Sequence, residues 1–274
     1  MRPPILETEH APRLADRLAA ARRGRFVGRL AEIEVFRAAL SADEPPFAVL
    51  HMHGPGGVGK SALLREYARL AAEAGRTVVQ VDGRNVDSTP PGLLLALRQA
   101  IEAGADGSVE ARMIHRLGDE NDASASLREM PRQARHDDMA RHDDGGWPAA
   151  GVWLIDTYEA LAPVDGWLRE TFLPGLSAGS LVVLAGREPP AAAWRTDLDW
   201  AELTRTVALR NLGPGESERY LAARGIPGDL HAEVLAFTHG HPLALALVAD
   251  VLARGERLTG FDPRSEPDVV RVLL

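Results

Sequence analysis

One short segment constrains the fold of this chain more than any other. Residues 54–61, Gly-Pro-Gly-Gly-Val-Gly-Lys-Ser, follow an apolar run at 46–53 and open a helix-forming stretch at 60–75. The segment matches the pattern G-x-x-x-x-G-K-[ST] of a loop that binds phosphate groups. Glycines let backbone N–H groups turn inward around phosphates, and the following helix directs the positive end of its dipole at them. The sequence therefore predicts a strand–loop–helix unit that holds a phosphorylated ligand.

Lys60, within this segment, is the only lysine in the chain, and all the other members of the 31 Lys and Arg residues are arginine. An ammonium group is a compact charge, whereas a guanidinium is planar and bulkier and does not replace it inside a tight loop. We infer that Lys60 contacts β- and γ-phosphates and that Ser61 offers an oxygen to Mg²⁺. A chance glycine-rich turn is the other interpretation, but it leaves the solitary lysine unexplained.

Composition and charge exclude several classes of protein. A chain of 274 residues is long enough for one large α/β domain or for a core domain with a smaller one. The absence of cysteine excludes a disulfide framework and a thiolate metal site. A net charge of −8 argues against general nucleic-acid binding, and no apolar run is long enough for a membrane span or signal core. We expect a cytoplasmic protein.

Strands and helices alternate along most of the chain. The expected strands lie at 46–53, 76–82, 151–156, 180–186 and 204–212. The expected helices are 11–23, 31–40, 60–75, 90–104 and 166–176, followed by 214–225, 227–240 and 241–255. Strands that alternate with helices predict an α/β fold with a parallel sheet and helices on both faces. The wholly helical end of the chain predicts a smaller appended subdomain.

We expect the chain to divide into four parts. These are an N-terminal helical segment at 1–23, a core at 24–212, a small helical subdomain at 213–260 and the start of a truncated following domain at 261–274. Within the core, polar residues 118–149 interrupt the alternation, and the sequence ARHDD occurs there twice. A stretch this long without periodicity indicates a mobile insertion. Its His and Asp content leaves a metal site as the alternative.

Two charged residues lie at the ends of predicted strands. Asp156 ends the strand at 151–156, and Arg187 follows the strand at 180–186. In proteins with this phosphate loop, an aspartate at such a strand end belongs to the Mg²⁺ shell, so Asp156 joins Ser61 as a candidate metal ligand. A cation at the position of Arg187 can reach the γ-phosphate. The alternatives are an aspartate that caps a turn and a surface arginine.

Five segments in this order resemble one family. They are FVGR at 26–29, GPGGVGKS at 54–61, WLIDTYE at 153–159, LAGRE at 184–188 and GHPLAL at 240–245. Together they resemble the nucleotide-binding module of STAND-class P-loop ATPases, a group related to AAA+ proteins that includes NB-ARC switches and bacterial regulators. The resemblance spans residues 24–255. It implies a P-loop NTPase sheet with strand order 5-1-4-3-2 that binds ATP or ADP with Mg²⁺.

The resemblance also implies roles for single residues. The FVGR segment would lie along the adenine and ribose, Asp156 would be the Walker B aspartate, and Arg187 the sensor arginine. Pro242 would pack against the nucleotide from the small subdomain, although a proline also suits the start of a helix. The candidate nucleotide-binding residues are then Val27, Gly28, Arg29, Gly54, Pro55, Gly56, Gly57, Val58, Gly59, Lys60, Ser61, Ala62 and Pro242.

The sequence departs from the family at two places. The acid that often follows the Walker B aspartate is replaced by Thr157, and the next acid is Glu159. The chain also ends where a further domain would begin. We therefore predict an ATP- or ADP-dependent switch with slow hydrolysis, part of a longer signalling or regulatory protein. Its candidate catalytic residues are Lys60, Asp156, Glu159 and Arg187.

This prediction leaves two other functions open. A P-loop kinase or transferase would use residues 118–149 as a substrate lid, and an interaction scaffold would carry an inactive site. The intact Lys60, Ser61 and Asp156 argue against the scaffold. For the switch we expect contacts with further domains or protein partners and a nucleotide-dependent oligomer, without direct binding to nucleic acid or membrane.

Overall fold

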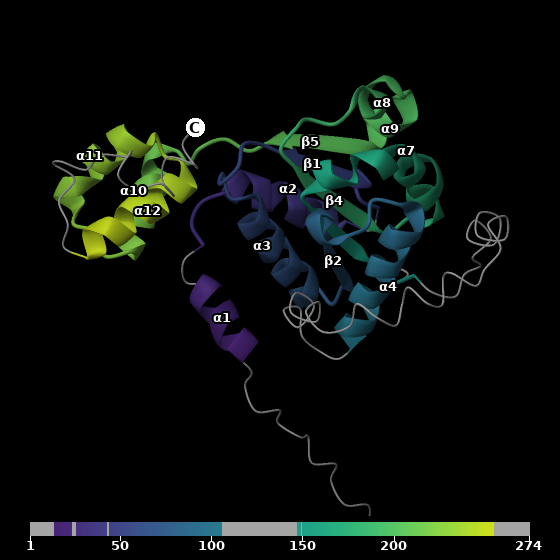
Figure 1. The fold of residues 1–274 in the computed structure, drawn as a ribbon, viewed down its shortest axis with the longest axis horizontal. Helices are drawn as coiled ribbons and strands as arrows, with labels where there is room; N and C mark the ends of the chain where they lie inside the picture. Colours follow the sequence, from purple (N-terminus) through teal and green to yellow (C-terminus); the bar gives the residue numbers. More distant parts are fainter. Residues whose placement is uncertain (1–13, 24–25, 43, 106–146, 149, 255–274) are drawn as a thin grey trace, which may run out of the picture.

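A five-stranded parallel sheet forms the centre of the molecule (Figure 1). The computed structural model describes residues 14–23, 26–42, 44–105, 147–148 and 150–254. The strands are β1 (Val49–His53), β2 (Val78–Asp82), β3 (Val152–Asp156), β4 (Leu181–Gly186) and β5 (Thr204–Ala208). They pair in parallel in the order β2-β3-β4-β1-β5. This is the predicted order counted from the opposite edge, so the predicted sheet is confirmed.

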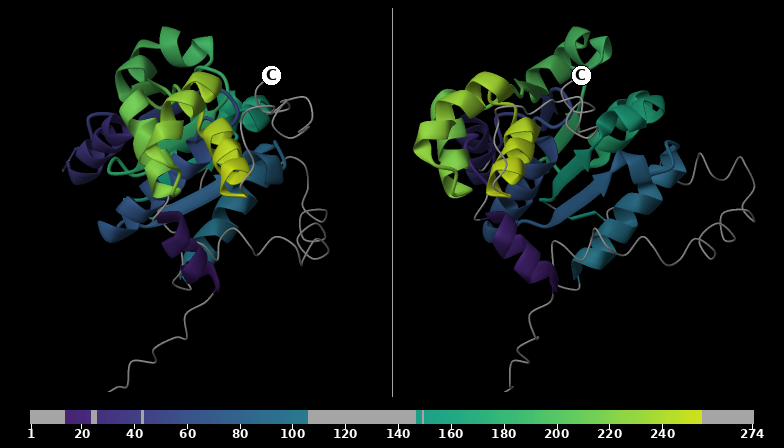
Figure 2. Two further views of the ribbon diagram at one scale, coloured as in Figure 1. Left: turned by 90° about the vertical axis from the view of Figure 1, so that its left-hand side faces the viewer. Right: turned by 60° about the vertical axis from the view of Figure 1, so that its left-hand side comes forward.

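Helices cover both faces of the sheet because successive strand residues point to opposite sides. Leu50, Met52 and Leu154 face a core formed with α2 (Leu30–Ser41) and α3 (Lys60–Glu73). Trp153 and Ile155 face a second core, formed with α4 (Pro90–Ala105) and the segments after β3. The views in Figure 2 show these layers from two further sides. Burial on both faces explains why β3 and β4 read as nearly continuous apolar runs.

The segment after β3 differs from the single helix predicted at 166–176. It contains the short helical pieces η4 (Tyr158–Val164), α7 (Asp165–Trp167), η5 (Leu168–Phe172) and η6 (Leu173–Gly175). Pro163 and Pro174 lie within these pieces, and a proline lacks the N–H that continues a regular helix. The sequence pattern also missed η1 (Gly83–Asn85), α8 (Ala192–Thr196) and α9 (Leu198–Leu203), which are too short for a clear period.

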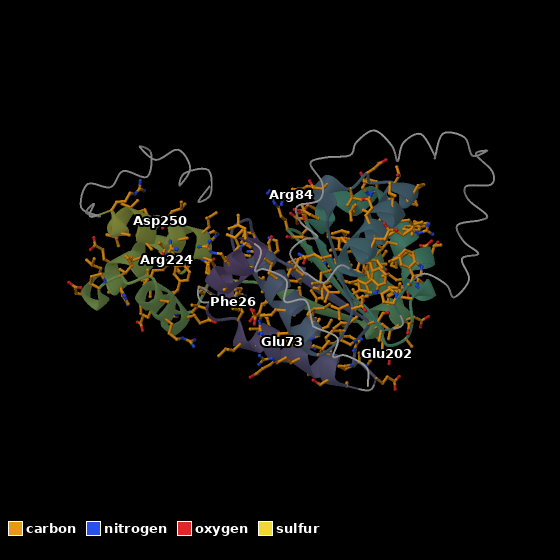
Figure 3. All side chains as sticks on the ribbon, turned by 90° about the horizontal axis from the view of Figure 1, so that it is seen from below. Phe26, Glu73, Arg84, Glu202, Arg224 and Asp250 are labelled. Atoms are coloured by element: carbon orange, nitrogen blue, oxygen red, sulfur yellow. The ribbon has the colours of Figure 1, made fainter. Side chains whose placement is uncertain are left out.

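Three helices form a bundle beside the sheet: α10 (Pro214–Ala223), α11 (Gly228–Thr238) and α12 (Pro242–Ala253). Their shared core contains Leu212, Leu221, Ile226, Val234, Leu245, Val248 and Ala249. Figure 3 shows Arg224 and Asp250 together in this bundle, where they form an ion pair of 2.5 Å. Because the bundle has its own apolar core, we refer to α10–α12 as the helical subdomain.

Several predicted parts lie outside the described residues. Residues 1–13 and 255–274 do so, as does the insertion at 118–149 except for residues 147 and 148. The helix expected at 11–23 is described as α1 (Leu14–Arg23). The four-part division of the chain remains a prediction. In the described part of the chain, none of the helices is both long enough and apolar enough to cross a membrane.

Candidate nucleotide-binding site

The phosphate loop connects β1 to α3, as the sequence predicts. Gly57 and Gly59 adopt positive φ angles of 73° and 104°, which a residue with a side chain rarely tolerates. A Cβ atom built on Gly56 or Gly59 would meet no atom of the described residues within 4 Å. The first N–H groups of α3 have no partner within the helix itself, so they remain available as donors to an anion. The loop therefore has left-handed glycines, open space beside Gly56 and Gly59, and backbone donors at the start of α3.

Lys60 lies at the first position of α3 and turns back toward the loop. Its Nζ donates to the carbonyl oxygens of Gly54 and Pro55, at 2.6 and 2.9 Å. Burial lowers the pKa of this amine, and the nearby carboxylates of Glu159 and Asp156 oppose that effect. Phosphate oxygens are charged acceptors and bind an ammonium more strongly than neutral carbonyls do. Lys60 therefore already contacts the loop in which we expect its charge to bind phosphate oxygens.

Asp156 is the last residue of β3 and lies at the carboxyl ends of the strands, as the phosphate loop does. It is only 6% exposed. One of its oxygens accepts a hydrogen bond from the backbone N–H of Thr157 at 2.8 Å. Thr157 has a left-handed conformation, with φ of 52°. Its side chain forms a hydrogen bond with Asp82, which is aligned with Asp156 on the adjacent strand β2. Thr157 therefore joins the ends of two strands and redirects the chain.

Glu159 reaches the end of β4 because of this turn. Its carboxylate accepts from the backbone N–H of Arg187 at 3.1 Å and lies 3.4 Å from the Arg187 Nε. Glu159, Asp156 and Arg187 all influence the pKa of Lys60. The four candidate catalytic residues are therefore gathered at one edge of the sheet, and their assigned catalytic roles remain predictions.

Asp82 and Arg84 also lie at this edge and were not identified from the sequence. Burial alone would raise the pKa of Asp82, but hydrogen bonds from Arg84 and Thr157 outweigh burial and hold that pKa below its usual value. The Asp82 carboxylate raises the pKa of Arg84, and the charges of Asp156 and Glu159 act in the same direction. Figure 3 places Arg84 on the side of the core that is turned toward the helical subdomain. Both residues could have been predicted from their position in the sequence, because Asp82 is the last residue of β2 and Arg84 follows shortly after it.

The FVGR segment connects the phosphate loop to the helical subdomain. The guanidinium of Arg29 is buried and donates to the carbonyls of Val58, at 2.8 Å, and Arg210, at 2.6 Å. The backbone N–H of Arg29 donates to Glu216 on α10 at 2.8 Å. Gly28 packs so closely on this carboxylate that a Cβ would lie 2.4 Å from it. Arg29 thus binds protein carbonyls, and contacts of Val27, Gly28 and Arg29 with a nucleotide stay predictions.

Pro242 begins α12, and the first turn of that helix lies against the loop. A Cβ on Gly57 would come within 2.8 Å of a His241 ring carbon and 2.9 Å of the Leu243 Cβ. Pro242 is half-buried at the first helical position, which a proline fits because its missing N–H needs no partner there. The helical subdomain therefore contacts the phosphate loop directly.

The residues at this edge fit a magnesium nucleotide. The loop backbone and Lys60 would hold the phosphates, and Ser61 and Asp156 would provide oxygen ligands for Mg²⁺. Bound Mg²⁺ would neutralise charge that develops on the phosphate oxygens. A separate cavity of about 420 Å³ lies at the amino ends of β1 and β4, lined by residues that include Leu173, Val182 and Trp200. It is distant along these strands from the loop, and we assign it no part in nucleotide binding.

Fold and site together define a P-loop nucleotide-binding protein. The chain matches the family described as AAA ATPase domain over residues 25–250, and it belongs to that family. Membership implies nucleotide binding, typically with Mg²⁺. No curated protein matches the chain.

Two solved structures are similar to this chain. The Walker-type ATPase PABY2304 of Pyrococcus abyssi is 15% identical, with a TM-score of 0.55, over 85% of this chain and 70% of that one. The RuvB Holliday junction branch migration motor of Thermotoga maritima is 12% identical, with a TM-score of 0.45, over 84% of this chain and 65% of that one. At 15% identity, the likeness to the Walker-type ATPase concerns the fold alone.

His51, on β1 just before the loop, is expected to make the fold sensitive to acid. Burial lowers its pKa from 6.5 to about 4, with a smaller contribution from His53. The unfolded chain therefore binds more protons between these two pH values, so the free energy of unfolding must fall as the pH falls through this window. The expected loss is on the order of 3 kcal/mol.

Urea unfolding at pH 7 and pH 4 of the wild type and of His51→Leu measures this contribution. The wild type should lose more stability than the variant between the two pH values. Equal losses in the two proteins would show that His51 does not carry the effect.

Proposed function

We propose that this AAA-type ATPase domain is an ATP- or ADP-dependent switch of the STAND class. The bound nucleotide would lie between the phosphate loop and the helical subdomain and would set how the two are arranged. The observation that carries the proposal is the packing of the first turn of α12 on Gly57. A ligand bound in the loop would necessarily act on this contact.

Hydrogen bonds between the FVGR segment, the phosphate loop and the start of the helical subdomain support the same proposal. Arg29 binds the carbonyls of Val58 in the loop and of Arg210, just after β5. Glu216, in the first turn of α10, accepts from Arg29 and from Gly213. A displacement of Val58 by the nucleotide would therefore be transmitted to both ends of the segment that leads into the subdomain. We propose that Pro242 and the FVGR segment contact the nucleotide from this side.

The switch belongs to a longer signalling or regulatory protein in this proposal, and its output passes to further domains or protein partners. A ligand biases two conformations only through a difference in its free energy of interaction with them. ATP and ADP differ in the γ-phosphate, and we propose that Lys60 and Arg187 contact it. Such contacts typically provide a coupling of about 1–3 kcal/mol.

Hydrogen exchange of the backbone amides in residues 209–213 and in α12 tests the switch. We expect protection factors that differ by about tenfold between the protein with ADP and the protein with a non-hydrolysable ATP analogue. Lys60→Ala should remove the difference. Identical exchange with the two nucleotides, at saturating binding of both, would contradict the switch and leave a simple nucleotide-binding domain.

A further inference from the structure

His241, the residue before α12, makes two hydrogen bonds with one ring. Its Nδ1 accepts from the backbone N–H of Ala244 at 3.4 Å, which caps the helix. Its Nε2 lies 3.0 Å from the carbonyl oxygen of Gly56 in the phosphate loop. A carbonyl oxygen can only accept, so Nε2 carries the proton, and Nδ1 must be unprotonated to accept from Ala244. The two partners together assign the neutral tautomer with hydrogen on Nε2.

The contact with Gly56 also orients a neighbouring donor. The Gly56 carbonyl and the Gly57 N–H belong to one planar peptide, and the described residues contain no cis peptide bond. In a trans peptide these two groups point in opposite directions. A carbonyl held toward His241 therefore directs the Gly57 N–H away from α12. In a phosphate loop, the function of such an N–H group is to donate to a phosphate oxygen.

Two other side chains hold further carbonyls of the same loop. Lys60 binds those of Gly54 and Pro55, and Arg29 binds that of Val58. Lys60 and Arg29 both belong to the core, whereas His241 belongs to the helical subdomain. The Gly56 carbonyl is thus bonded from the helical subdomain, whereas the carbonyls of Gly54, Pro55 and Val58 are bonded from the core.

We propose that His241 is a positioning residue of the phosphate loop, which orients the Gly57 N–H for a nucleotide phosphate only when α12 is docked. The inference rests on the proposed nucleotide binding and adds the means by which the subdomain regulates it. Because coupling between two equilibria is reciprocal, a bound phosphate then favours docking of α12 by the same factor. The close approach at Gly57, where a Cβ would overlap Leu243, keeps this contact sensitive to small displacements.

Two conservative substitutions separate the two hydrogen bonds. An Asn side chain reaches about as far as Nδ1, so His241→Asn keeps the helix cap and loses the contact with Gly56. A Gln amide reaches about as far as Nε2, so His241→Gln keeps a donor to Gly56 and loses the cap. Arg224→Ala is the matched control, because Arg224 bonds to Ala246 and Asp250 in the same subdomain and is not bonded to the loop.

Isothermal titration with ADP and with adenosine, both with Mg²⁺, gives the test. We expect His241→Asn to weaken ADP binding about five- to tenfold without changing the affinity for adenosine, because only ADP carries phosphates. His241→Gln should bind ADP within about twofold of the wild type although its melting temperature is lower, and Arg224→Ala should do the same. Unchanged ADP binding in His241→Asn, or equal losses for ADP and adenosine, would overturn the inference. Failure of the wild type itself to bind ADP would instead refute the proposed function.

Discussion

Replacing Lys60 with alanine is expected to weaken the binding of ADP and ATP by about 100-fold or more while the protein stays folded. The ammonium group bonds to two loop carbonyls and lies among Asp156, Glu159 and Arg187. Hydrogen bonds to charged groups contribute about 1.5–3 kcal/mol each, and Lys60 can donate to more than one phosphate oxygen. The loss should therefore exceed that of any other single substitution in the loop. Titration with each nucleotide measures it.

Lys60→Arg tests whether a positive charge alone is sufficient at this position. It keeps the charge, but the guanidinium is too bulky to enter the turn between Gly54 and Lys60, so binding should remain weak. Arg69→Ala serves as the control for removal of a cation from the same helix, because Arg69 pairs with Glu66 and Glu73 on α3. Binding by Lys60→Arg at wild-type strength would show that any cation suffices and that the solitary lysine has another cause.

ATP hydrolysis by the wild type is expected to be slow, below about 1 s⁻¹. Thr157 follows Asp156 where a catalytic acid often stands, and its hydroxyl is bonded to Asp82. Glu159 is the acid that the turn at Thr157 brings to the site, but its carboxylate is held by Arg187. A positioned carboxylate contributes about 10²- to 10⁴-fold to water activation, and the Glu159 carboxylate is engaged by Arg187 instead of being free to orient a water molecule.

Glu159→Gln should therefore remove most of the residual hydrolysis, about 10²-fold or more, and leave ADP affinity within a few fold of the wild type. A phosphate-release assay on the wild type, Glu159→Gln and Lys60→Ala decides the point. Turnover above about 1 s⁻¹ that Lys60→Ala abolishes would refute slow hydrolysis. Activity that Glu159→Gln leaves unchanged would require another base, and Asp156 would be the next residue to substitute.

Sequence patterns predicted the arrangement of the sheet well because its central strands β1, β3 and β4 are buried on both faces. Trp153, Leu154 and Ile155 are all apolar, and the polar residue that follows them marks the strand end that reaches the site. The phosphate loop was equally clear, since its glycines and Lys60 follow from backbone and charge requirements that are local. These features depend on neighbours within a few residues along the chain.

The parts that could not be predicted depend on approaches between distant segments. No periodicity indicates that Glu216 accepts from Arg29, or that His241 reaches Gly56 across 185 residues of sequence. The pairing of Glu159 with Arg187 likewise follows from the left-handed turn at Thr157, a conformation that threonine rarely adopts. The sequence thus identified Lys60, Asp156, Glu159 and Arg187 at the site but missed Asp82 and Arg84. The structure adds which of these charged residues hold one another.

Covalent labelling of Lys60 tests the central claim, nucleotide binding at the phosphate loop, most directly. Lys60 is the only side-chain amine in the chain, and the N-terminal amine provides an internal reference. Because burial lowers the pKa of Lys60, a larger fraction of this amine is neutral and reactive at neutral pH than for an ordinary lysine. Mass spectrometry after brief acylation, with and without millimolar Mg-ATP, reads both amines. We expect Mg-ATP to slow labelling of Lys60 about tenfold or more, as near-saturating occupancy requires, and to leave the N-terminus unaffected. Equal labelling of Lys60 under the two conditions would contradict the claim that this loop binds the nucleotide.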